Sequence, residues 1–99
     1  MHNNETVFEW DEYKAKSNLR KHKVSFEVAV QVFNDPSAVS IQDRIESNEE
    51  RWKTIGKVNG VTILSVAHTV IFDEMEIIRI ISARRATYRE RKHYECNEI

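Results

Sequence analysis

Residues that could act on an anionic substrate gather in two basic segments of the sequence. Residues 14–23 contain five bases, one histidine and no acid. Residues 79–93 contain six bases against one acid, whereas residues 35–50 hold five acids against one base. Because the whole chain has a formal net charge of −1, these clusters indicate a local anionic partner and not a protein that is basic throughout. The plainer interpretation is that each charge run is the solvated face of a helix.

The first basic segment carries its candidate side chains on one face of a predicted helix. Lys14, Asn18 and Lys21 are spaced at i, i+4 and i+7, a spacing that brings all three to the same side. His22 would end this helix, where the helix dipole favours a protonated imidazole. The segment therefore predicts two phosphate-binding lysines, Lys14 and Lys21, beside a histidine that could transfer protons.

The second basic segment supplies arginines to the end of a predicted strand. Arg79 lies among isoleucines, where an arginine needs an ion-pair partner or a cleft. Arg84 and Arg85 follow where the strand ends, a common place for functional residues. The two point in different directions, so we expect one of them to face a given ligand. Arg79 and Arg84 are five residues apart, so strict alternation puts them on opposite faces unless the strand twists or breaks near Ser82.

A further histidine, His68, alternates with Leu64 and Val66 along another predicted strand and therefore shares their face. If that face is buried, His68 is a hydrogen-bonded interior residue, and the pattern favours this interpretation over a catalytic one. Its alternative role is to contact substrate or to act as the acid or base.

Cofactor chemistry is not indicated by the sequence. The four histidines are widely spaced, without a His-x-x-x-His pair, and Cys96 is the chain's one cysteine. A glycine-rich phosphate loop and a nucleophile elbow are both absent. We therefore expect no metal site, no internal disulfide and no cofactor.

Length and composition predict one globular domain over residues 1–99. The chain is 40% hydrophobic and 31% charged, too apolar for a disordered protein and too charged for a membrane protein. Its longest mostly apolar stretch, residues 61–72, is too short to span a bilayer as a helix. The first residues lack the pattern of a signal peptide, and a single cysteine suits a reducing compartment, so we expect a cytoplasmic protein.

The periodicity of apolar residues predicts an α+β fold. Asp11 and Ser25 are candidate N-caps of two helices, and Thr87 and Glu90 have the spacing of a capping box for a third. Asn59-Gly60 is a strong signal for a two-residue hairpin turn. The predicted order is a strand at 7–10, helices at 12–22 and 26–34, strands at 38–42, 51–58, 61–70 and 76–83, and a closing helix from Tyr88.

Several blocks of the sequence together resemble BrnT-type toxins. The blocks, in the order of the family, are Phe8-Glu9-Trp10-Asp11, Lys14, Asn18, Lys21-His22, Val24-Ser25-Phe26-Glu27, Val32-Phe33-Asn34-Asp35-Pro36, Glu50-Arg51-Trp52, Ile55-Gly56, Ile78 to Thr87, and Arg89-Glu90-Arg91. They extend over nearly the whole chain. Two departures are Lys23, where the family usually has glycine, and residues 71–76, which are longer and more acidic than expected for that turn.

The resemblance implies a RelE-like fold and a metal-independent endoribonuclease that cleaves RNA and inhibits translation. It also implies a ribbon-helix-helix antitoxin (BrnA-like) as the partner in a heteromeric complex, with operator DNA bound only through that antitoxin.

RNA cleavage without a metal needs a base, an acid and cations around the phosphorane. We assign the phosphorane to Arg84, with Arg79 or Arg85 assisting, because an arginine fork binds two phosphate oxygens. Lys14 or Lys21 would hold substrate phosphates. His22 or, after it, His68 would supply the base or acid.

Two other interpretations remain open at this stage. The chain could be a non-catalytic binding module that acts with its antitoxin as an operator-binding corepressor, although no recognition helix of its own stands out. Alternatively, the arginines could be ion-paired structurally to the acids of residues 35–50.

Overall fold

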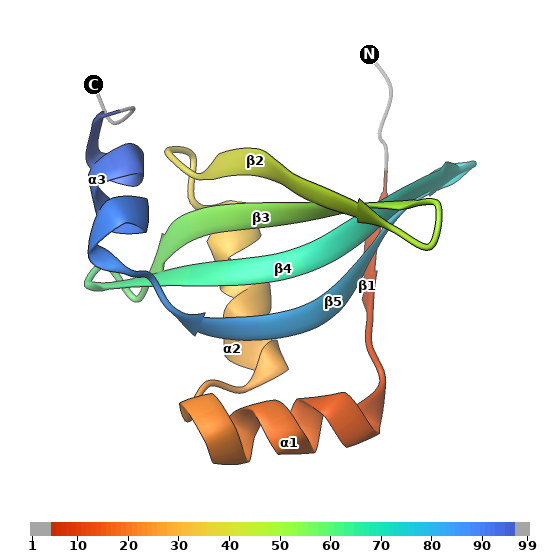
Figure 1. Cartoon of the computed structure of the whole chain (residues 1–99), viewed down its shortest axis with the longest axis horizontal. Helices are drawn as coiled ribbons and strands as arrows, with labels where there is room; N and C mark the ends of the chain where they lie inside the picture. The colour runs from red at the N-terminus through yellow and green to blue at the C-terminus, as the bar shows by residue number, and fades with distance from the viewer. Residues whose placement is uncertain (1–4, 97–99) are drawn as a thin grey trace.

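The computed structural model describes residues 5–96, which form a five-stranded sheet with helices on both faces (Figure 1). In chain order the elements are β1 (Thr6–Glu9), α1 (Glu12–His22), α2 (Phe26–Ala29), the 3-10 helix η1 (Val30–Asn34), β2 (Val39–Glu46), β3 (Glu49–Val58), β4 (Thr62–Asp73), β5 (Met75–Arg85) and α3 (Tyr88–Cys96). The strand order is β1-β5-β4-β3-β2, in which β1 is parallel to β5 and the other neighbours are antiparallel. The predicted α+β architecture is confirmed.

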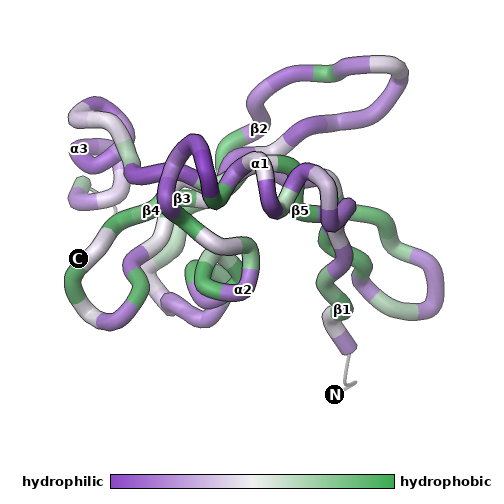
Figure 2. The backbone as a smooth tube through the Cα atoms, turned by 90° about the horizontal axis from the view of Figure 1, so that it is seen from below, coloured by the Kyte–Doolittle hydropathy of each residue, from purple (hydrophilic) through white to green (hydrophobic). Residues whose placement is uncertain are grey.

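The main core lies between the sheet and the helices α1, α2 and η1, on the face that we call the inner face (Figure 1). Figure 2 shows α2 as a hydrophobic segment, whereas α1 and the β2–β3 hairpin are largely hydrophilic. Phe26, Ala29 and Val32 are completely buried there against the sheet residues Val66 and Ile80. This burial of an apolar stripe holds the short helical segment in place.

A second, smaller core lies on the opposite, outer face, where α3 packs. Ile55, Ala86 and Tyr94 are buried in it. Figure 1 shows α3 over one end of the sheet only, so the other end of the outer face is left without a helix among the described residues. None of the helices in residues 5–96 is long and apolar enough to cross a membrane.

The predicted helix starts are confirmed by their hydrogen bonds. Asp11 Oδ1 accepts from the backbone N–H of Tyr13 at 2.9 Å, and Ser25 caps α2 in the same way. Thr87 and Glu90 form the predicted capping box: Glu90 Oε1 accepts from the N–H of Thr87 at 2.8 Å, and Thr87 Oγ1 accepts from that of Glu90 at 3.2 Å. Local sequence therefore determines where each helix begins.

The single helix predicted over residues 26–34 is wrong in its second half. The chain tightens into the 3-10 helix η1 after Ala29. A Cβ on Gly56 of β3 would lie 2.9 Å from both the Cβ and the carbonyl oxygen of Val32, so this segment packs directly onto the strand backbone. We attribute the tighter turn to this close approach and to β-branched valines, which suit a longer α-helix less well.

The strands are longer than predicted. The segment expected to be a long turn, residues 71–76, is mostly paired: Phe72 faces Glu76 and Asp73 faces Met75, and the chain reverses at Glu74 with a φ of 60°. Strand β2 likewise runs on to Glu46.

Lys23 adopts the left-handed conformation, with a φ of 62°, where the resembled family usually has glycine. Its backbone N–H donates to the carbonyl oxygen of Leu19 at 2.9 Å and closes the end of α1. The loop therefore keeps its shape at a cost of about 1 kcal/mol relative to glycine.

Candidate active site

A bulge in β5 brings Arg79 and Arg84 to the same face of the sheet. Ile80 and Ser82 pair with successive residues of β4, which leaves Ile81 without a partner opposite. The extra residue shifts the alternation of side chains by one. Arg79 and Arg84 therefore both project from the outer face, as required if both are to contact one ligand.

Arg84 is held by a carboxylate from α3. Its Nη1 donates to Oε1 of Glu90 at 2.8 Å and its Nη2 to Oε2 at 3.0 Å, and Lys53 Nζ donates to the same Oε2 at 3.0 Å. Burial acts to raise the pKa of Glu90, but the hydrogen bonds from Arg84, Thr87 and Lys53 outweigh it and lower that pKa to about 2. The same contact raises the pKa of Arg84. The cluster keeps Arg84 fixed in orientation and retains one net positive charge.

A row of polar side chains crosses the open end of the outer face. Thr69 pairs with Arg79 across β4 and β5, and the β3–β4 register places Arg51 on the other side of Thr69. Arg79 and Arg51 have weak ion pairs, to Glu9 at 3.3 Å and to Glu46 at 3.5 Å. The buried Nε of Arg51 and Oγ1 of Thr69 have no hydrogen-bond partner in the described part of the chain. An anionic ligand here would find oriented donors.

The predicted basic face of α1 lies beside the bulge of β5. Lys14, Lys21 and His22 line a shallow pocket of about 170 Å³ together with Ile81 and Ser82. The structure therefore brings the first basic segment next to the strand that carries the arginines of the second. From the sequence, this juxtaposition was expected only if the helix packs beside the end of that strand.

Asn18 fixes this juxtaposition. Strand β1 ends at Glu9, opposite Arg79, so β5 has a free edge beyond that point. Asn18 fills it: its Nδ2 donates to the carbonyl oxygen of Ala83 at 2.9 Å, and the N–H of Ala83 donates to Asn18 Oδ1 at 3.0 Å. The side-chain amide thus takes the place of a strand's peptide group. Asn18 Nδ2 also donates to the carbonyl oxygen of Val24 at 2.9 Å, and Asn18 is only 6% exposed.

Arg85 is not brought to the outer face. It follows Arg84 in the strand and so points to the inner side, where it is exposed and lines a groove with His22 and Lys23. The prediction that the two adjacent arginines point in different directions is confirmed.

His68 is separated from Arg79 and Arg84 by the thickness of the sheet. It is 3% exposed on the inner face, its ring lies edge-on to Phe33, and its Nε2 is 2.7 Å from Oγ1 of Thr54. Burial lowers its pKa, against the opposing effects of the Thr69 backbone and Glu76. This is the interior arrangement that strand alternation favoured.

Three residues of the site were not predicted from the sequence: Arg51, Lys53 and Thr69. Glu90 was predicted only as a cap. Arg51 and Lys53 occupy alternate positions of a predicted strand, a signal that would have placed both on one face. The sequence carries no comparable signal for Thr69, because its role depends on which strands become neighbours.

No group of three or more His, Cys, Asp or Glu side chains within residues 5–96 is arranged to hold a metal ion. His22, His68 and His93 lie on different elements, and Cys96 is exposed at the end of α3.

Comparisons with known proteins identify the family and the fold of this chain. A family model described as the ribonuclease toxin BrnT of type II toxin–antitoxin systems matches residues 10–90. The 1.1 Å crystal structure of the Brucella abortus ribonuclease toxin BrnT is similar at a TM-score of 0.64 and 26% sequence identity, covering 83% of this chain and 96% of that one. The search of curated proteins found no match. The resemblance drawn from the sequence is confirmed, and the chain belongs to the family of BrnT ribonuclease toxins of type II toxin–antitoxin systems.

Proposed function

We propose that this chain is a metal-independent endoribonuclease that cleaves cytoplasmic RNA, and thereby inhibits translation, on the outer face of its sheet. The observation that carries the proposal is the bulge at Ile81, because it places Arg79 and Arg84 on one face beside the pocket of Lys14, Lys21 and His22. Oriented cations on a face that α3 alone, among the described helices, covers at one end suit an extended polyanion better than a small ligand.

The chemistry would be attack of a ribose 2′-hydroxyl on the adjacent phosphate. The attacking oxygen must lose a proton, the leaving oxygen must gain one, and negative charge develops on the phosphorane. Arg84 is the main stabiliser of that charge, because Glu90, which Lys53 holds in turn, already fixes its position. Arg79 and the additional Arg51 bind the flanking phosphates.

Proton transfer is assigned to His22 because His68 lies on the other face of the sheet. His22 ends α1 in the pocket beside Ser82, together with Lys14 and Lys21, which would hold the RNA backbone there. Arg85 would contact RNA only if the RNA runs past the end of β5 and enters the groove that Arg85 shares with His22.

The antitoxin of such a system is the expected partner. We propose a ribbon-helix-helix antitoxin that covers the basic outer face with acidic or apolar side chains and holds operator DNA itself, since a chain of net charge −1 is a poor binder of duplex DNA.

Metal independence is tested by incubating the purified protein with RNA in EDTA. Cleavage should continue at an unchanged rate, and the products should carry the 2′,3′-cyclic phosphate that internal attack leaves. The complex with the antitoxin should be inactive. An activity that disappears on chelation and returns with magnesium would contradict the mechanism.

A further inference from the structure

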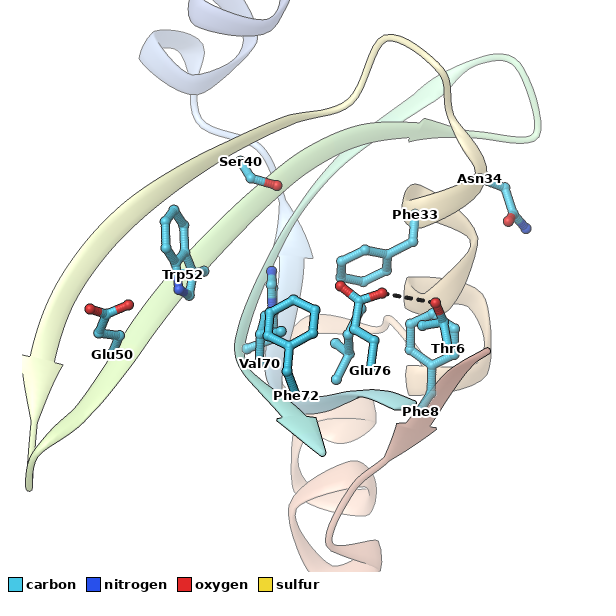
Figure 3. A pocket seen from close by; sticks show the side chains of 12 residues that line it. Thr6, Phe8, Phe33, Asn34, Ser40, Glu50, Trp52, Val70, Phe72 and Glu76 are labelled. Carbon is cyan, nitrogen blue, oxygen red and sulfur yellow. Dashed lines mark hydrogen bonds between the residues drawn. The ribbon is translucent and has the colours of Figure 1, made fainter. Parts of the chain in front are cut away.

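The largest pocket among the described residues lies away from the proposed active face. It has a volume of about 580 Å³ and opens on the inner face, at the end of the sheet that α1 and α2 leave uncovered. Figure 3 shows Glu50 and Trp52 of β3 on one side, with Glu76, Phe72 and Phe8 on the other. The size is in the range of ligand pockets.

The walls of this pocket combine aromatic rings with carboxylates. Phe8, Phe33, Trp52 and Phe72 supply the rings, while Glu50 and Glu76 supply the negative charge, and no lysine or arginine within residues 5–96 lines the pocket. Thr6 Oγ1 donates to Oε1 of Glu76 at 2.8 Å and holds that side chain in place. Aromatic faces beside carboxylates are the chemistry that binds a planar organic cation.

A buried histidine also lines the pocket. Nε2 of His68 is hydrogen-bonded to Thr54, and the Thr54 hydroxyl is hydrogen-bonded to that of Ser40 at 2.8 Å. The ring lies edge-on to Phe33. These contacts fix the imidazole in the wall of the pocket.

The surroundings of the pocket indicate a protein ligand. Phe72 is 75% exposed and Ile45 on the same face is 65% exposed, so an apolar surface continues beyond the pocket. The two turns at this end of the sheet carry six acids and no base over residues 46–50 and 73–76. A free small cation would not need the apolar surface, whereas a cationic segment with apolar flanks uses both.

We infer that this pocket receives an arginine, flanked by apolar residues, from the antitoxin. The guanidinium lies against Trp52 and between Glu50 and Glu76. The inference takes the identity of the partner from the proposed function. It adds an anchoring site on the face opposite the proposed nuclease surface.

The test compares three charge-removing variants of the full chain, titrated with the purified antitoxin encoded beside it. Glu76→Gln and Glu50→Gln should each weaken binding about 30-fold or more, because each removes one of the two carboxylates that flank the guanidinium. Glu49→Gln is the matched control: the same charge is removed one residue away, on the outer face. It should leave binding within about twofold.

RNA cleavage by the free variants is measured in parallel and should be unchanged in all three. Equal weakening by Glu49→Gln would indicate general electrostatic attraction and overturn the inference, as would unaltered binding by both pocket variants. If the wild-type chain fails to cleave RNA but the pocket variants lose antitoxin binding, the proposed nuclease function falls and the docking site stands.

Discussion

The two faces of this sheet differ at its open end, although the same strands build both. In β3, Arg51 projects from the outer face while its neighbours Glu50 and Trp52 line the inner pocket. In β5, Arg79 is outer and Glu76 inner. Acids are present on both faces, since Glu9 and Glu46 pair with the outer arginines, but no lysine or arginine of the described residues lines the inner pocket. Alternation along the strands thus gives a chain of net charge −1 two surfaces suited to different ligands.

The largest expected effect comes from removing the central cation of the outer face. Arg84→Ala should lower the rate of RNA cleavage about 100- to 1,000-fold, because a fixed donor to the developing charge is lost. The rate is measured with purified protein on a defined RNA, and growth arrest is scored on expression. Antitoxin binding should be retained, because the proposed anchoring pocket for the antitoxin lies on the inner face.

Lys92→Ala is the control for this comparison, since Lys92 is an exposed base on α3 outside the proposed site. It should cleave RNA at the wild-type rate. A folded Arg84→Ala protein that still arrests growth at the wild-type dose would place the active site elsewhere.

The next largest effect is expected at the contact between Asn18 and the free edge of β5. Asn18→Ala removes three hydrogen bonds and leaves the N–H and C=O of Ala83 without partners at the edge of β5. Unfolding in urea should show a loss of about 3 kcal/mol. The neighbouring Ser17→Ala, at an exposed position of the same helix, should cost less than about 0.5 kcal/mol. A loss in Asn18→Ala no larger than this would mean that the attachment of α1 does not depend on the hydrogen bonds of Asn18.

The smallest expected effect is on the pH dependence of stability. The free energy of unfolding, measured as the pH is lowered, should respond to groups on the two faces at different pH values. The depressed pKa of Glu90 contributes stability above its ordinary value of 4.5, and that contribution disappears as the pH falls toward 2. Glu90→Gln should therefore lose about 1–2 kcal/mol at pH 7, allowing for solvent screening, and should show a flatter decline below pH 4.5. Asp35, whose pKa is also lowered, supplies the rest of that decline.

The inner face responds at higher pH. The neutral form of His68 is favoured in the folded protein, so stability also falls as the pH drops below its ordinary value of 6.5. This part of the curve should persist in Glu90→Gln, as it should in the control Glu95→Gln, which removes an exposed acid of α3. A curve in Glu90→Gln that matches the wild type at every pH would show that the cluster of Arg84, Lys53 and Glu90 does not hold α3.

The parts of the fold that depend on local sequence were predictable. Caps at Asp11 and Ser25, the capping box at Thr87 and the turn at Asn59-Gly60 each involve residues only a few positions apart, and all four are found. The order of elements follows from the same signals.

The site was predictable in its residue types but not in its arrangement. Neither the pairing of Thr69 with Arg79 nor the contact of Asn18 with Ala83, 65 residues away, leaves a mark in local periodicity. The tightening of residues 30–34 depends in the same way on Gly56, which lies on a distant strand. Such features require knowledge of which segments become neighbours.

The bulge at Ile81 also constrains how many residues can separate Arg79 from Arg84. Deleting that one residue would leave Arg79 and Arg84 four positions apart in a regular strand and still on one face. Regular pairing that kept Ile81 in the ladder would instead turn Arg84 to the other side and break its contact with Glu90. The spacing of the two arginines is therefore constrained together with the bulge. In a relative without the bulge, two arginines with the same roles would have to be separated by an even number of positions, and an alignment that ignores this would match the wrong pair.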